Sequence, residues 1–298
     1  MTRPERWQRA HGRLALAVTL AAAGLGALLP TPGLPAQVFM LAALVAVLGL
    51  PHGAADPLPG AAVFRPRLGP AWPLAFGGLY VLAALAVLGL WALWPAAVLL
   101  GFLLLAVAHF GAEDRAATGP LLPGRAGAAL EAGLRGALPV ALPVLFHGGE
   151  VAALFAALLP EIDAGAVAGT LPTLLGAPGV AYLAALAALG LGALWRGRPG
   201  LAAELAALVA AFAVLPPLLA FALYFCFWHA PRHTLGQAAA FAPEEAPGDL
   251  AAGLRRIART ALPMTVATVA LAGAVFALSP AGLDAETVGL RVIFLGLA

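Results

Sequence analysis

The stretch PAAVLLGFLLLAVAHFGAED, residues 95–114, contains the pattern on which the whole chain is built. A long apolar run ends in a short polar island that holds His109, Glu113 and Asp114. A helix of about 20 predominantly apolar residues is long enough to cross a bilayer. Polar side chains buried at the end of such a helix are unfavourable unless they are paired or bind a ligand. The run therefore predicts a transmembrane helix, and the island predicts a functional site.

The composition places the entire chain in the membrane class. Of its 298 residues, 62% are hydrophobic and 10% are charged, whereas an ordinary soluble domain is about 25% charged. We predict an all-α fold, a polytopic integral membrane helix bundle of about eight transmembrane helices. The bundle is expected to form a single membrane-embedded domain over residues 1–298, surrounded by membrane lipid in the cell membrane.

The charged residues and the cysteine exclude several functions. The net charge is only +2 and the basic residues are spread over loops, which argues against a nucleic-acid partner. All 16 basic residues are arginine, so no lysine amine can hold retinal as a Schiff base in the way that opsins do. Cys226 is the only cysteine, and we therefore expect neither an intramolecular disulfide nor a thiolate metal cluster.

Apolar runs bounded by charged residues, proline and glycine mark the expected spans. These runs are 14–29, 36–51, 72–93, 95–112, 134–159, 171–194, 201–228 and 260–278. A final run, 287–298, is too short to cross a bilayer at about 1.5 Å per residue, so we expect it to be truncated or interfacial.

Arginines in the loops predict a cytoplasmic N-terminus by the positive-inside rule, since four of them precede the first span. Counting spans from there places His52 and His109 near cytoplasmic helix ends. If 201–228 is one crossing, however, His229 and His233 lie on the opposite side, about 30 Å away, too far for one metal ion to bridge.

At least one apolar run is therefore expected not to be an ordinary span. His147-Gly148-Gly149-Glu150 divides 134–159, and Pro216-Pro217 divides 201–228. Either run can be a broken or re-entrant helix. We favour a non-spanning 134–159, because this choice also returns the arginines at 255–259 to the cytoplasmic side.

Four of the six histidines lie in three polar islands, which are PHGAADP at 51–57, AHFGAED at 108–114 and FWHAPRH at 227–233. His229 and His233 are four residues apart, so on a helix both rings project from one face. Pro231 between them has no N–H and frees the carbonyl of Phe227, so the helix is expected to kink or end there. Four imidazoles suit Fe(II), Zn or Cu.

Acidic residues follow two of these histidines at a distance of one helical turn. Asp56 lies four residues after His52, and Glu113 and Asp114 lie four and five residues after His109. Such an acid can accept the second ring N–H of a metal-bound histidine and fix its orientation, and it can offset the charge of the ion. The alternative interpretation is that these are ordinary polar helix ends that meet water.

The other polar residues of the islands and termini have simpler interpretations. His11 lies among the N-terminal arginines and is expected to be solvated. His147 is interpreted as a structural or interfacial residue, with a further role at the site as the alternative. Arg232 is expected to anchor a helix at the cytoplasmic surface.

At the three islands the chain resembles the Brp/Blh family of integral-membrane β-carotene 15,15′-dioxygenases. The resemblance rests on PHGAADP at 51–57, HFGAED at 109–114 and WHAPRH at 228–233, and on the order and spacing of the spans between them. It implies that four histidines bind one non-haem Fe(2+), and by motif match these are His52, His109, His229 and His233.

The resemblance also implies an activity. O₂ would cleave the central double bond of β-carotene, or of a related carotenoid taken from the lipid phase, into two molecules of retinal, typically with a functional link to a rhodopsin. One departure concerns the C-terminus, because family members continue into an apolar segment ending in Thr-x-Pro-His. This sequence stops at Gly296-Leu297-Ala298, so its last helix is expected to be shortened.

Other functions remain as alternatives. A di-iron desaturase or hydroxylase needs more histidines than the six present. A histidine-rich membrane carrier, or a haem protein in which two histidines face each other across the haem, would use the same residues without cleaving carotenoids. A purely structural membrane protein would leave the four buried histidines without a role.

Overall fold

The computed structural model describes residues 3–159, 163–242, 249–279 and 284–297. Every element within these ranges is a helix, and none is a strand, which confirms the predicted all-α membrane fold. The α-helices are α1 (Arg3–Leu28), α2 (Leu34–Leu44), α3 (Leu50–Gly53), α4 (Pro57–Leu68), α5 (Trp72–Leu93), α6 (Pro95–Thr118), α7 (Gly124–Gly136), α8 (Leu138–Phe146), α9 (Gly148–Leu158), α10 (Ala164–Trp195), α11 (Pro199–Val214), α12 (Pro217–Tyr224), α13 (Ala230–Ala240), α14 (Leu250–Ala277) and α15 (Ala285–Leu297). Two π-helical turns, η1 (Val45–Gly49) and η3 (Phe225–His229), and one 3₁₀ turn, η2 (Gly69–Ala71), lie between them.

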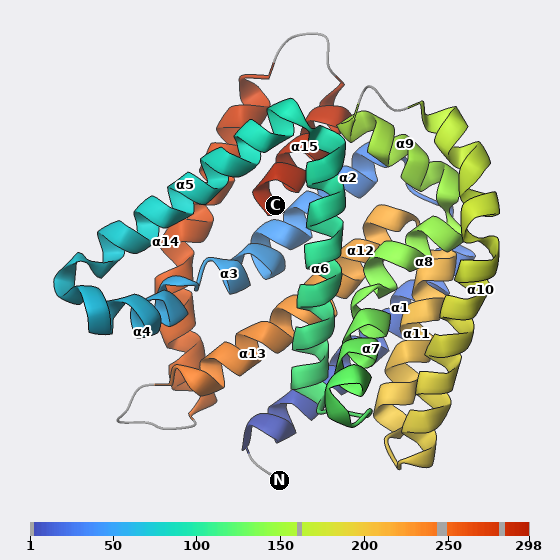
Figure 1. Ribbon diagram of the computed structural model, residues 1–298, viewed down its shortest axis with the longest axis horizontal. Coiled ribbons are helices and arrows are strands. Elements are labelled where there is room, and N and C mark those ends of the chain that lie inside the picture. Colours follow the sequence, from blue (N-terminus) through green and yellow to red (C-terminus); the bar gives the residue numbers. More distant parts are fainter. Residues whose placement is uncertain (1–2, 160–162, 243–248, 280–283, 298) are drawn as a thin grey trace.

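Five helical stretches in the described part of the chain are long and apolar enough to cross a membrane, or six if the bent pair α7 and α8 counts as one span. They are Arg6–Leu28, Leu34–Leu93, Pro95–Thr118, Gly176–Trp195 and Leu250–Ala277. The second of them has 60 residues and would be about 90 Å long if straight, three times the hydrocarbon thickness. It contains the predicted spans 36–51 and 72–93, between which the chain changes direction at α4 (Figure 1).

Both apolar runs that the sequence marked as suspect are broken. The run 134–159 is divided at Ala137, where α7 and α8 meet at 49°, and again at His147, which separates α8 from α9. The run 201–228 is divided where Leu215 and Pro216 adopt extended ψ angles of 145° and 152°. Proline at 217 has no N–H to continue the preceding helix. The breaks predicted at these two positions are therefore confirmed.

The helices form a bundle with a separate arm on one side (Figure 1). Helices α4, α5 and α14 make up the arm, and α7 to α11 pack together on the opposite side. Between them, α6 and the α12–η3–α13 segment cross near the centre. Tyr224 and Trp228, two of the largest fully buried side chains, lie on the α12–η3–α13 segment and belong to the main hydrophobic core.

The outer surface of the bundle is apolar. Leu82 on α5, Leu104 on α6 and Leu271 on α14 all have exposed side chains. A contiguous apolar surface of this kind marks contact with lipid rather than with water. The short last helix, α15, instead packs against α2, α9 and α14, and Nε of Arg291 donates to the carbonyl of Ala157 at 3.0 Å. The predicted run 287–298 lies in this helix, except that Ala298 is outside the described residues.

Candidate metal centre

Two π-helical turns bring the first and third polar islands together. The turn η1 comes directly before α3, which carries His52, and the turn η3 ends at His229. The two turns contact each other. A π turn contains one extra residue, so it rotates the helix that follows, and such turns are frequent at functional sites. The break at Pro216 redirects α12 and η3, which is how His229 reaches the histidines of α3 and α6.

Three histidines converge at this point. His52, His109 and His229 each offer a ring nitrogen, and these nitrogens lie within 4.8 Å of one another. The ring centroids of His52 and His109 lie 5.7 Å and 5.0 Å from that of His229. The three side chains come from three separate segments, and His229 is fully buried while His109 is exposed.

The hydrogen bonding of these rings fits a metal site. Both ring nitrogens of His229 are buried without a hydrogen-bond partner among the described residues. An unsatisfied buried polar group costs about 1–3 kcal/mol, so an imidazole with two of them requires a compensating ligand. His52 turns Nδ1 to the carbonyl of Gly49, which leaves Nε2 as the free nitrogen in the manner of a metal-bound histidine.

His233 lies beside this group but is not one of the three. Its ring centroid is 5.4 Å from that of His52 and 6.1 Å from that of His109. Nε2 of His233 contacts Nε2 of Gln237 at 2.8 Å. Nδ1 lies 3.1 Å from Oε2 of Glu113, close enough for an ion pair although the angle falls short of a hydrogen bond.

Two of the acidic residues that follow the histidines have different partners from those that the sequence pattern predicted. Glu113 reaches across to His233 rather than to His109 on its own helix. Asp56 accepts a hydrogen bond from the Tyr80 hydroxyl at 3.2 Å. A helix presents residues four apart on the same face, but a neighbouring helix can supply a closer partner for either.

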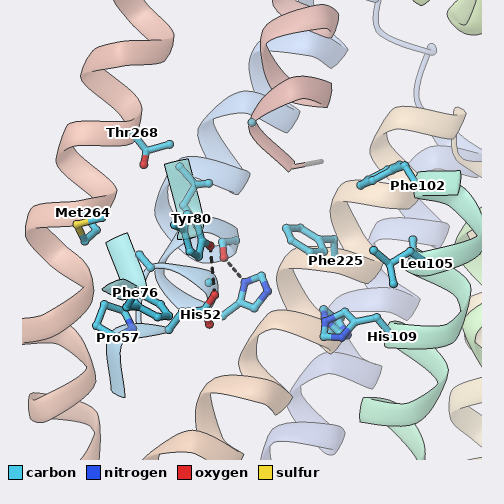
Figure 2. A pocket seen from close by; sticks show the side chains of 18 of the residues that line it. His52, Pro57, Phe76, Tyr80, Phe102, Leu105, His109, Phe225, Met264 and Thr268 are labelled. Atoms are coloured by element: carbon cyan, nitrogen blue, oxygen red, sulfur yellow. Dashed lines mark hydrogen bonds between the residues drawn. The ribbon is translucent and has the colours of Figure 1, made fainter. Parts of the chain in front are cut away.

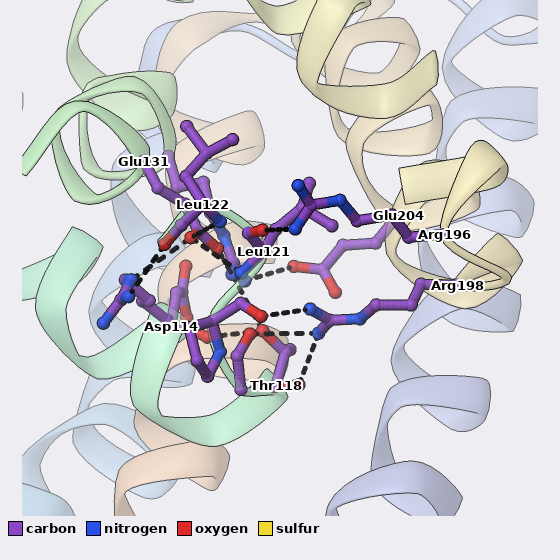
Figure 3. Close-up of polar contacts among 12 residues, drawn as sticks. Asp114, Thr118, Leu121, Leu122, Glu131, Arg196, Arg198 and Glu204 are labelled. Carbon is purple, nitrogen blue, oxygen red and sulfur yellow. Dashed lines mark hydrogen bonds and ion pairs between the residues drawn. The ribbon is translucent and has the colours of Figure 1, made fainter. Parts of the chain in front are cut away.

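Asp114 belongs to a different cluster, which we call the buried ion network (Figure 3). Three acids and three arginines alternate in this network: Asp114, Glu131, Glu204, Arg115, Arg135 and Arg232. Their formal charges cancel. The Tyr224 hydroxyl also donates to Asp114, at 2.8 Å.

Arg232 joins two acids of the network, Asp114 and Glu204, and its expected role as a surface anchor is wrong. Its side chain is only 4% exposed, and its guanidinium lies 3.0 Å from Asp114 on α6 and 2.6 Å from Glu204 on α11. It also lies over the Trp228 ring, 4.8 Å from the centroid. Partners on two other helices compensate the charge, which therefore does not need to reach the membrane surface.

The second half of the network ties α6 to α7. Glu131 accepts from Nε of Arg115 at 3.2 Å and from the backbone N–H groups of Leu121 and Leu122. Arg135 continues the chain of charges to Glu204, at 3.4 Å. Figure 3 also shows Arg196 and Arg198, which donate to carbonyls in the loop that follows α6.

The glycine of the HFGAED motif permits this contact between α6 and α7. A Cβ atom at Gly111 would lie 1.8 Å from the carbonyl oxygen of Ala132, and one at Gly136 would lie 1.8 Å from the carbonyl oxygen of Val107. The two backbones therefore touch, as in other membrane helix pairs with small residues at the interface. This approach places Glu131 and Arg135 next to the end of α6.

The remaining histidines both donate to backbone carbonyls. Nε2 of His147 lies 2.9 Å from the carbonyl oxygen of Phe212 on α11, outside the histidine group, in line with the structural interpretation. His11 is not solvated as expected. Its Nε2 lies 2.8 Å from the carbonyl oxygen of Phe227, which is the carbonyl that Pro231 frees. The sequence indicates that Pro231 leaves this carbonyl without its usual donor, but it does not show which side chain would reach it.

A cavity of about 760 Å³ opens beside the three clustered histidines (Figure 2). Apart from these histidines its walls are mainly apolar and aromatic, with Asp56, Tyr80 and Thr268 as polar exceptions. Phe76 and Tyr80 project from α5, Phe102 and Leu105 from α6, and Met264 and Thr268 from α14 (Figure 2). The cavity thus lies between the arm and the rest of the bundle.

Fold and site together define a polytopic helical membrane protein with a histidine cluster at the wall of an apolar cavity. Residues 43–298 match the family described as beta-carotene 15,15'-dioxygenase, and the chain belongs to this family. Over an alignment of 293 residues it is 30% identical to the probable beta-carotene 15,15'-dioxygenase Blh of Halobacterium salinarum. The alignment covers 90% of this chain and 83% of the relative. No solved structure matches the chain significantly.

Proposed function

We propose that this protein cleaves the central 15,15′ double bond of β-carotene, or of a related carotenoid, with O₂ to give two molecules of retinal. The observation that carries the proposal is the convergence of three histidine nitrogens, within 4.8 Å of one another, at the wall of an apolar cavity. Family membership and the name of the Halobacterium relative support the substrate class. The reaction balances without a further reactant, since one C=C bond breaks, two C=O bonds form, and both oxygen atoms enter the products.

A bound Fe(2+) would be held by His52, His109 and His229, with His233 as the fourth ligand. It would supply the redox chemistry through which O₂ reacts with a polyene, and neutral imidazoles are suitable ligands for it. In this assignment Nε2 of His233 would bind the ion in place of its contact with Gln237, and Glu113, 3.1 Å from Nδ1, would orient the ring. Asp56 adds negative charge near the ion, whereas Asp114 is already paired with Arg232.

The cavity walls bind and orient the substrate in this proposal. A carotene has no polar group, so its position depends on the shape of the space between α5, α6 and α14. Val81, Leu105 and Met264 line the cavity and have exposed side chains, so the cavity is open on this side. We infer that a carotenoid enters sideways from the lipid through this opening, and that the apolar walls exclude water from the reacting bond.

The geometry favours a single ion over haem. A haem with two histidine ligands needs them on opposite faces of a flat macrocycle. Here a third nitrogen lies within 4.8 Å of the other two and would overlap the macrocycle, so the three together suit a single ion instead. A carrier without cleavage activity would have no use for a cluster of unsatisfied nitrogens at the wall of its binding cavity.

We also propose where the protein is located and where its product goes. The arginines ahead of the first span favour a cytoplasmic N-terminus in the cell membrane. Because the chain has no lysine, it cannot retain retinal as a Schiff base, and the product leaves for an acceptor such as a rhodopsin.

Expression in a host that makes β-carotene tests the proposal directly. We expect the orange colour of the cells to fade and retinal to accumulate, and ¹⁸O₂ should label the product aldehydes. The matched control is the His147→Ala variant, which removes a histidine outside the cluster and should still form retinal. Unchanged pigment with the protein confirmed in the membrane would refute the proposal.

A further inference from the structure

The carbonyl of Phe227 lacks its regular α-helical donor and is bonded instead by a side chain of α1. In an α-helix this carbonyl would accept from the N–H of residue 231, but Pro231 has none. A buried carbonyl without a donor costs about 1–3 kcal/mol. Nε2 of His11, on α1, fills the position at 2.8 Å. Since the partner is a carbonyl, Nε2 carries the proton and His11 is the donor.

Two more hydrogen bonds join α1 to the same segment. Nε2 of Gln8 donates to the carbonyl of Arg232 at 3.0 Å. Nε1 of Trp228 donates to the hydroxyl of Thr19 at 2.8 Å, and both side chains are buried. These hydrogen bonds from α1 therefore fall at residues 227, 228 and 232, on either side of His229.

Helix α1 lies entirely before residue 43, where the match to the family begins. His11 is not among the residues that line the cavity. Its only ring contact among the described aromatic residues is with Trp228, at 6.5 Å between centroids. Any effect of His11 on the reaction must therefore pass through the turn that carries His229.

We propose that α1 is part of the metal centre, and that His11 is a positioning residue that holds the π turn η3 in the conformation presenting His229. The inference rests on the proposed function, because it concerns the histidine ligands of that site. A π turn is less stable than regular helix and persists where the surroundings compensate it. Here the bond from His11 satisfies the carbonyl that Pro231 leaves free.

Substitutions at residue 11 test this role in the full-length protein. His11→Phe keeps a ring against Trp228 but removes the donor, whereas His11→Gln keeps an N–H donor at a similar reach. We expect His11→Phe to weaken Fe(2+) binding about ten- to hundred-fold, the usual effect of losing a group that orients a metal ligand. His11→Gln should restore most of the affinity. The KM for carotenoid should stay unchanged in both, because the cavity walls are intact.

The matched control is His147→Phe, which removes the same kind of bond, from a histidine Nε2 to a backbone carbonyl, at 2.9 Å. That carbonyl belongs to α11, which carries none of the four histidines, so the Fe(2+) affinity should be unchanged. If His11→Phe fails to accumulate, Gln8→Met can be used instead, because it removes the neighbouring donor. It should also weaken Fe(2+) binding, but by a smaller factor.

The outcomes separate this inference from the proposed function. Wild-type affinity for Fe(2+) in folded His11→Phe, or in Gln8→Met where that variant is needed, overturns the role of α1. Equal losses in His11→Phe and His147→Phe also overturn it, because they indicate a general effect of lost packing. A wild-type protein that binds no transition metal refutes the proposed function, and this inference with it.

Discussion

The histidine cluster and the buried ion network are neighbours on α6 and along the η3–α13 segment, but they satisfy their polar groups in opposite ways. In the network, Arg232 reaches Asp114 and Glu204 within 3.0 Å, and the charges of three acids and three arginines cancel. In the cluster, both ring nitrogens of His229 lack a partner among the described residues.

This difference separates a structural role from a functional one. A buried polar group that already has partners holds helices together and is not available to a ligand. A buried group without partners is unfavourable, and a functional ligand explains why it persists. We therefore expect substitutions in the cluster to remove activity while the protein stays folded. Substitutions in the network should destabilise the fold itself.

The largest expected effect on activity is that of His229→Ala. The change should abolish retinal formation, because it removes the most buried of the three clustered ligands. The amount of protein in the membrane should remain close to wild type, since an unsatisfied imidazole contributes little to folding. Retinal measured by chromatography and protein measured by immunoblot give both quantities. Retained activity in this variant would remove His229 from the site.

Arg232→Met should have the largest effect on stability. It leaves Asp114 buried without its arginine and Glu204 with Arg135 alone, and breaking a buried ion pair in this way costs about 3–5 kcal/mol. The free energy of unfolding can be measured by helix loss during SDS titration of mixed micelles. Adding Glu204→Gln should recover part of the loss. A variant as stable as wild type that lacks only activity would contradict the assignment of Arg232 to the structural network.

Gly136→Ala tests the close approach of α6 and α7 that supports the network. The new Cβ would lie 1.8 Å from the carbonyl oxygen of Val107, and backbone atoms cannot turn away as a flexible side chain can. We expect a loss of about 1–3 kcal/mol in unfolding free energy, as for other overpacked sites. Gly133→Ala on the same helix is the control, because no atom of another helix in the described part of the chain lies within 4 Å of its Cβ position. Equal stability of the two variants would show that the helices separate easily.

Tyr80→Phe should have the smallest effect on activity, because Tyr80 lies beside the histidine cluster and is not part of it. It removes the hydrogen bond to Asp56 beside the cavity, worth about 0.5–1.5 kcal/mol. We expect kcat/KM for carotenoid to fall by no more than about ten-fold. Tyr182→Phe, which loses a bond to the carbonyl of Leu134, should leave kcat/KM unchanged. Complete loss of activity in Tyr80→Phe would instead make Tyr80 a catalytic residue.

The sequence predicted the features that depend on local patterns. Apolar runs indicated the helices, and the breaks at His147 and at Pro216 followed from glycine and proline. The three islands also marked the residues that meet at the cavity. The topological conflict over His229 pointed to a broken segment, and the structure divides both suspect runs.

Features that depend on pairing between distant helices were not predicted. Arg232 resembled a surface anchor because its partners, Asp114 and Glu204, lie 118 and 28 residues away. Glu204 inside an apolar run was a usable signal, since a carboxylate there requires a buried cation. The role of His11 was hidden for the same reason, because its partner at residue 227 is 216 residues away.

Metal analysis together with a visible absorption spectrum of the purified protein tests the central claim most directly. The account predicts about one iron per chain, as for a single mononuclear site, with no Soret band. His229→Ala should lose the iron, and Arg232→Met should retain it in whatever fraction remains folded. A Soret band, or carotenoid cleavage by protein free of any transition metal, would contradict the account.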